Sequence, residues 1–142
     1  ATVLTADQPA QVVHFFPGQD AYGAGAGQGD PSMTVLTPAE QFAPGATFAT
    51  PPGVTDDYVQ LAWDSAATTA VFVDGVQVTA FEGIGGSTFR LANLAVSNGT
   101  HVVTTSPAGQ GVGLEVYGYY QYTSYASAGP RRFQVLAPAL VP

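Results

Sequence analysis

Apolar and polar residues alternate along most of this 142-residue chain, and turn-forming residues interrupt the alternation about every 8–12 positions. A period of two is typical of half-buried β-strands, and no stretch of about 11 residues has the period of an amphipathic helix. The best helix candidate, residues 38–42, is a single turn. The pattern predicts an all-β protein, an antiparallel β-sandwich of about 9–11 short strands. The expected strands are residues 2–4, 11–16, 33–36, 47–49, 58–63, 69–73, 76–81, 89–94, 101–105, 113–119 and 133–136.

Two dipeptides indicate tight hairpins. Asp74-Gly75 separates two β-branched runs, and Asn98-Gly99 separates residues 94–97 from residues 100–103. Both pairs suit a type I′ turn, whose central residues need positive φ. We therefore expect a hairpin at each position. Asn98-Gly99-Thr100 is also formally an N-glycosylation acceptor, although the turn explains it better.

A long glycine-rich segment, residues 17–31, contains five glycines and cannot be a strand. We expect it to be a loop at one end of the sandwich, and loops of this length are usually functional or disordered. Its polar and aromatic side chains Asp20, Tyr22 and Asp30 are candidate ligand contacts.

We expect residues 1–137 to form one domain and residues 138–142 to be a terminal tail or linker. The chain begins without Met, so we expect a mature product or a piece of a longer protein.

Charge is scarce in this chain. Charged residues make up 9% of it, the net charge is -7, and all three basic residues are arginines. Such a chain is a poor partner for nucleic acid and for anionic membranes, and no apolar run is long enough for membrane insertion. The absence of cysteine excludes disulfides and thiolate chemistry. With so little charge to cover a surface, we expect part of it to be buried in self-association as a homo-oligomer.

No pattern in the chain indicates a catalytic centre, a metal site or a cofactor. His14 and His101 lie in separate expected strands, without acids at metal-ligand spacing. Asp56-Asp57 is the one adjacent acidic pair and leaves calcium as an open alternative. Ser87 follows two glycines without the helix that a nucleophile elbow requires. We therefore expect a protein that is not an enzyme. A glycoside hydrolase stays open only if two carboxylates face one cleft about 5–9 Å apart.

Tyrosines concentrate between residues 117 and 125. On a strand, Tyr117 and Tyr119 share one face with Glu115, while Leu114 and Val116 share the other. Exposed tyrosine rings suit sugar stacking or protein contact, and packing against a second layer is the alternative. Two of the three arginines follow closely and could bind an anionic ligand or pair with acids. The candidate ligand-binding residues are Tyr117, Tyr119, Tyr120, Tyr122, Tyr125, Arg131 and Arg132.

Several short motifs, in order along almost the whole chain, resemble the IgGFc-binding protein N-terminal domain family. They are Thr5-Ala6-Asp7-Gln8-Pro9, Asp30-Pro31-Ser32-Met33-Thr34, Pro38-Ala39-Glu40-Gln41-Phe42, Phe48-Ala49-Thr50-Pro51, Val73-Asp74-Gly75, Gly99-Thr100-His101, Val116-Tyr117-Gly118-Tyr119 and Ser124-Tyr125. The resemblance implies a β-rich extracellular module with a role in adhesion or binding and no catalytic centre. It covers only part of the longer family region, and the glycine loop is expanded. The absence of cysteine fits a bacterial member better than an animal one.

Together these features predict an extracellular or cell-surface, non-enzymatic module that binds a glycan or a glycoprotein as part of a larger or oligomeric protein. The alternative is a structural subunit that assembles with itself, as in a trimeric fibre tip or a filament, without a small-molecule ligand.

Overall fold

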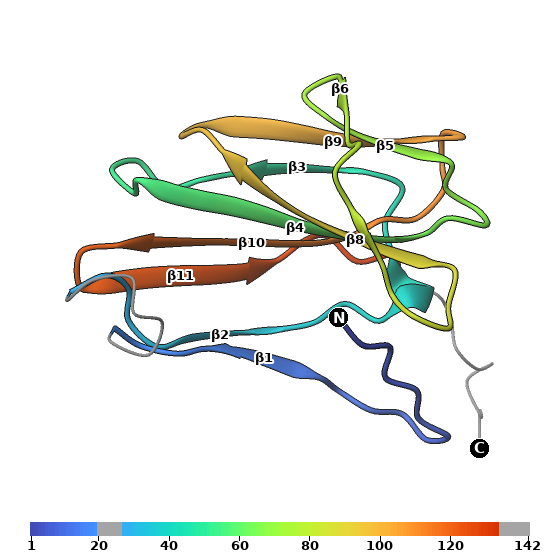
Figure 1. Cartoon of the computed structure of the whole chain (residues 1–142), viewed down its shortest axis with the longest axis horizontal. Helices are drawn as coiled ribbons and strands as arrows, with labels where there is room; N and C mark the ends of the chain where they lie inside the picture. Colours follow the sequence, from blue (N-terminus) through green and yellow to red (C-terminus); the bar gives the residue numbers. More distant parts are fainter. Residues whose placement is uncertain (20–26, 134–142) are drawn as a thin grey trace, which may run out of the picture.

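The computed structural model describes residues 1–19 and 27–133 and folds them into three antiparallel sheets (Figure 1). The first sheet has five strands in the order β11-β10-β4-β8-β7, the second has four in the order β3-β9-β5-β6, and the third pairs β1 with β2. The bounds are β1 (Val13–Phe16), β2 (Ser32–Val35), β3 (Ala46–Ala49), β4 (Asp56–Asp64), β5 (Ala70–Val73), β6 (Val76–Gln77), β7 (Glu82–Gly83), β8 (Phe89–Val96), β9 (Thr100–Ser106), β10 (Gly113–Tyr120) and β11 (Thr123–Ala128). A 3-10 turn, η1 (Ala39–Gln41), stands where the single helical turn was expected.

The expected β-sandwich is confirmed. The four-stranded sheet lies over one face of the five-stranded sheet, and the β1–β2 pair lies beneath the other face (Figure 1). Between the two large sheets, alternate residues of each strand form the core, as the period of two requires. In β4 these are Val59, Leu61 and Trp63, which meet Val71 and Val103 from the opposite sheet.

The β1–β2 pair is a third layer that covers the outer face of β10. His14 and Phe16 point toward the five-stranded sheet, while Val13 and Phe15 point away from it. Beneath them β10 is buried on both faces, so that Glu115 is only 4% exposed although it lies on the outer side. Residues from one end of the sequence therefore bury a carboxyl group from the other end.

The hairpin at Asp74-Gly75 is confirmed. Asp74 has a φ of 52° and Gly75 a φ of 80°, as a type I′ turn needs, and Val73 pairs with Val76.

The hairpin expected at Asn98-Gly99 is wrong. β8 pairs with β4 and β7, whereas β9 pairs with β3 and β5, so this connection is an arch between the two large sheets. Of its two central residues only Gly99 has positive φ, which excludes the type I′ turn. The arch forms because β3 and β5 occupy the two edges of β9, and because crossing over places the apolar sides of β8 and β9 in opposite layers of one core.

The remaining differences are missing, shortened and additional strands. Residues 2–4 form no strand, and the strand expected over residues 76–81 ends at Gln77. β7 and β11 were not expected. Phe133 is irregular, and the rest of the strand expected over residues 133–136 lies outside the described residues, as do Asp20, Tyr22 and the tail at residues 138–142. No helix in the described part of the chain is long and apolar enough to cross a membrane.

Candidate functional site

The turn between β10 and β11 presents two exposed tyrosines. Tyr120 is 42% exposed and Tyr122 is 63% exposed. Tyr122 has a φ of 54°, and this left-handed residue reverses the chain. Two backbone hydrogen bonds then hold the turn against the end of the glycine-rich segment: Tyr122 N–H donates to Gly27 across 2.7 Å, and Gly29 N–H donates to Tyr120 across 2.9 Å.

Gly27 and Gly29 explain why glycine is needed beside these rings. Both have positive φ, and a Cβ atom at Gly27 would lie 3.0 Å from the Tyr122 ring, while one at Gly29 would lie 3.1 Å from the Tyr119 ring. Only glycine lets the backbone approach an aromatic face so closely. Residues 27–29 therefore pack against the turn, and two backbone hydrogen bonds fix the backbone that carries the exposed rings of Tyr120 and Tyr122.

Tyr117 and Tyr119 belong to the layer interface. The ring centroid of Phe16 lies 4.9 Å from that of Tyr117, and Tyr58 stacks on Tyr117 at 5.3 Å. The Tyr117 hydroxyl donates to Asn93 across 2.8 Å. Tyr119 is half-buried beside Phe16, at 6.4 Å. Their rings fill the space between β10 and the β1–β2 pair.

Tyr125 points to the opposite face, into the core. Its hydroxyl donates to the Asp57 carboxyl group across 2.6 Å, and burial together with this bond raises the pKa of Tyr125. Asp57 is itself buried and accepts a second hydrogen bond from Asn98 across 2.8 Å. Asp57 and Glu115 are thus buried on opposite faces of the same sheet, so these two carboxyl groups do not share a cleft.

The arginines lie at the other end of β11 from the exposed tyrosines. β11 has six residues, which span about 20 Å as an extended strand. Arg131 follows it, pairs with Phe42 and donates to the Val35 carbonyl across 3.0 Å, while Arg132 is exposed. The turn between β10 and β11 that carries Tyr120 and Tyr122, here called the tyrosine turn, is instead flanked by two exposed acids. Asp30 follows Gly29, and Asp56 pairs with Tyr119.

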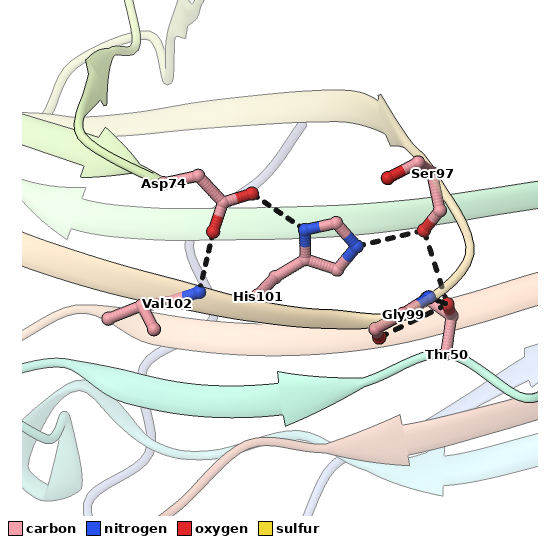
Figure 2. A network of polar contacts seen from close by, with 6 residues as sticks. All are labelled: Thr50, Asp74, Ser97, Gly99, His101 and Val102. Carbon is pink, nitrogen blue, oxygen red and sulfur yellow. Dashed lines mark hydrogen bonds and ion pairs between the residues drawn. The ribbon is translucent and has the colours of Figure 1, made fainter.

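A buried histidine forms a polar network at the arch between the sheets (Figure 2). His101 Nδ1 lies 2.7 Å from the Asp74 carboxylate, and its Nε2 lies 2.8 Å from the Ser97 carbonyl oxygen. Both partners are acceptors, so both ring nitrogens must donate, and this geometry selects the charged imidazolium. The bond to Asp74 raises the pKa of His101, and the same bond lowers the pKa of Asp74.

This network stabilises the fold and lacks the arrangement of a catalytic triad. Ser97 offers its carbonyl to the ring rather than its hydroxyl, so Ser97, His101 and Asp74 are not arranged as a nucleophile, a base and an orienting acid. His101 also stacks on Phe48 at 5.1 Å, which ties the turn of β5–β6 and the arch to β3. An open groove of about 360 Å³ lies beside it, lined by the β5–β6 hairpin and the end of β8.

A second histidine pair lies under the third layer. His14 Nδ1 contacts both carboxylate oxygens of Glu115 at 3.1 Å. Burial raises the pKa of Glu115, and the bond from His14 opposes that rise. No local pattern indicates a partner for either histidine, because each partner lies far away along the chain. The alternation placed Glu115 beside Tyr117, but nothing in it indicated that β1 would cover them.

Within residues 1–19 and 27–133, no group of three or more His, Asp and Glu side chains is placed to hold a metal ion.

A family model described as IgGFc binding protein matches residues 1–118 of the chain. The match covers most of the chain and ends just before the tyrosine turn. No curated protein and no solved structure gave a significant match.

Proposed function

The chain belongs to the IgGFc binding protein family, and on that premise we propose that it is an extracellular, non-enzymatic adhesion module that binds uncharged glycans through Tyr120 and Tyr122. The family is one of binding domains that are typically extracellular or at the cell surface. The glycan, the tyrosine turn as its site and the role in adhesion are our proposals. We do not propose that this chain binds immunoglobulin, although the family is named for that activity.

The exposure of Tyr120 and Tyr122 on a braced turn is the observation that supports this proposal. An exposed tyrosine offers an apolar face and a hydroxyl with few rotatable bonds, which suits stacking on a sugar ring. Because backbone hydrogen bonds to Gly27 and Gly29 already hold the turn, little conformational entropy is lost on binding.

The local charge favours an uncharged ligand. Asp30 and Asp56 flank the turn, and the arginines lie about 20 Å away at the other end of β11, beyond the screening length of roughly 8 Å at physiological salt. Sialylated or sulfated glycans would meet negative charge without a nearby cation. Two rings give a weak single site, and presentation of several copies would raise avidity by about 10²–10⁴.

A glycan array tests the proposal, with the protein presented as a monomer and as clusters on beads. Clustered wild-type protein should bind neutral glycans, and Tyr120→Ala with Tyr122→Ala should abolish binding. Phe133→Ala removes an exposed aromatic ring at the other end of β11 and should leave binding unchanged. The absence of binding by clustered wild-type protein would refute the proposal, and so would equal loss with Phe133→Ala.

A second candidate function, self-assembly, is favoured by the outward face of the β1–β2 pair. Phe15 is 69% exposed and its cross-strand partner Met33 is 64% exposed, next to Val13 and its partner Val35. Such an uncharged apolar ladder suits burial against another copy. Light scattering over a range of concentrations tests this, with Phe15→Ser and Met33→Ser expected to prevent association. A wild-type chain that stays monomeric at high concentration would exclude it.

A further inference from the structure

Asn98 holds the arch between the sheets through its side-chain amide. Its Nδ2 donates toward three oxygens, the Pro51 carbonyl at 3.1 Å, the Val54 carbonyl at 3.0 Å and the buried Asp57 carboxyl group at 2.8 Å. Its Oδ1 accepts from Gly53 N–H at 3.1 Å. An amide nitrogen has two hydrogens, so three oxygens share them. One side chain thus closes the loop over residues 50–54 against the start of β4.

The residue after Asn98 is held just as firmly. Gly99 N–H donates to Thr50 Oγ1 across 2.9 Å, and Thr50 N–H donates to the Gly99 carbonyl across 2.9 Å (Figure 2). Thr50 is buried, and its hydroxyl points toward the Ser97 carbonyl at 3.2 Å. Gly99 is therefore held through both its N–H and its carbonyl oxygen.

We propose that Asn98 is a deamidation site that the fold holds closed, and that its reaction irreversibly opens the loop over residues 50–54. In this reaction the Gly99 nitrogen attacks Asn98 Cγ, the N–Cγ bond forms, and the Cγ–Nδ2 bond breaks. Ammonia leaves with the proton of Gly99 N–H. Water then opens the resulting succinimide to aspartate or isoaspartate. Glycine at the following position leaves the attacking nitrogen without steric protection, so the hydrogen bonds must supply that protection.

The native geometry opposes each requirement of the first step. The Gly99 nitrogen has to lose its proton and rotate toward Cγ, but Thr50 Oγ1 accepts that proton in a hydrogen bond, and the bond from Thr50 N–H holds the Gly99 carbonyl. The leaving nitrogen is retained by its three acceptors. The reaction therefore needs a local opening of the loop, whose free energy sets the rate in the folded chain.

The product cannot close the loop again. A carboxylate at position 98 has no N–H to donate, and one of its oxygens would face two carbonyls and the Asp57 carboxyl group. Removing the donor from the buried Asp57 carboxyl group and adding a like charge beside it are both destabilising.

Mass spectrometry of the full chain after incubation at mildly alkaline pH tests the proposal. Aspartate plus isoaspartate at position 98 should form at least about tenfold more slowly in the folded chain than in the same chain unfolded in urea. Thr50→Val removes the hydroxyl that binds Gly99 N–H and should raise the folded-state rate several-fold. Thr105→Val is the matched control, because Thr105 is also a buried threonine that donates to a carbonyl but lies toward the other end of β9.

Each outcome decides the question. Equal rates in the folded and unfolded chains would overturn the protection, and no reaction in the unfolded chain would overturn the site. An equal acceleration by Thr50→Val and Thr105→Val would show that only global stability matters. For the product, Asn98→Asp should speed hydrogen exchange at the amides of Thr50, Gly53 and Val54 more than Asn98→Ala does. The same exchange in both variants would refute the added effect of the charge.

Discussion

His14 Nδ1 lies 3.1 Å from both carboxylate oxygens of Glu115, a residue 101 positions away. This pair joins the β1–β2 layer to the outer face of β10, in a setting where Glu115 is buried and His14 is partly exposed. A buried carboxylate needs a donor, and His14 supplies it. The attachment of the third layer is therefore sensitive to both residues.

Replacing His14 with alanine should cost about 1–3 kcal/mol of unfolding free energy at neutral pH. The buried Glu115 carboxylate would lose its donor, and the cost stays below the roughly 3–5 kcal/mol of a fully buried pair because solvent screens His14. Urea unfolding measures this, and adding Glu115→Gln should recover most of the loss. A double variant no more stable than His14→Ala would contradict the assignment.

The stability contribution of Glu115 should fall as the pH rises. Its folded pKa lies above the ordinary value of 4.5, so the folded chain binds this proton more tightly than the unfolded chain does. The Glu115 contribution is therefore complete below pH 4.5 and is lost as the pH rises through the folded pKa. Glu115→Gln should lack this decline above pH 4.5. Parallel curves of unfolding free energy against pH for the two proteins would refute the prediction.

The bond between Asp74 and His101 should stabilise the fold within a defined pH window. The pKa of His101 is raised, so its contribution is complete below 6.5 and is lost as the pH rises through the folded pKa. The pKa of Asp74 is lowered, so its contribution is complete above 3.8 and is lost as the pH falls through the folded pKa. Asp74→Asn should therefore lower the Tm most between pH 3.8 and pH 6.5. The control Asp30→Asn changes an exposed acid and should not alter the profile.

Gly29→Ala should destabilise the tyrosine turn more than Gly53→Ala destabilises its own loop. Both glycines have positive φ, so both variants incur the strain of a left-handed alanine, about 1 kcal/mol. At Gly53 a Cβ atom meets nothing within 4 Å, whereas at Gly29 it would meet the Tyr119 ring at 3.1 Å. The difference in unfolding free energy between the two variants measures the ring contact. Equal losses would mean that Tyr119 moves aside freely.

Tyr125→Phe should cost about 1.5–3 kcal/mol, as expected for a hydrogen bond to a charged group. Asp57 would keep only Asn98 as a side-chain donor among the contacts described above. Tyr120→Phe removes an exposed hydroxyl and should change stability by less than about 0.5 kcal/mol. Chemical denaturation of both variants gives the comparison. A loss with Tyr125→Phe no greater than with Tyr120→Phe would show that Asp57 is satisfied by other partners.

Local pattern predicted some turns and strands correctly and one turn incorrectly, for a reason visible at Asn98. Asp74-Gly75 and Asn98-Gly99 have the same turn chemistry and similar apolar flanks, yet only the first forms a hairpin. Whether two flanking strands pair with each other depends on what else can occupy their edges. β3 and β5 pair with the two edges of β9, and no local feature of residues 94–103 encodes that competition.

The tyrosine cluster illustrates the same limit. Alternation correctly placed Tyr117 and Tyr119 on one face of β10 and Leu114 and Val116 on the other. It could not tell that β1 would cover the tyrosine face, or that the length of β11 would separate Arg131 from the exposed rings.

By itself the sequence determined the all-β architecture and the type I′ turn at Asp74-Gly75, because backbone preference and side-chain alternation act over a few neighbouring residues. Only the tertiary structure decided which faces are buried, which tyrosines reach solvent and which acid each histidine meets. Those outcomes depend on contacts between residues as far apart as His14 and Glu115, and such a contact is set by the competition of whole strands for edges and faces.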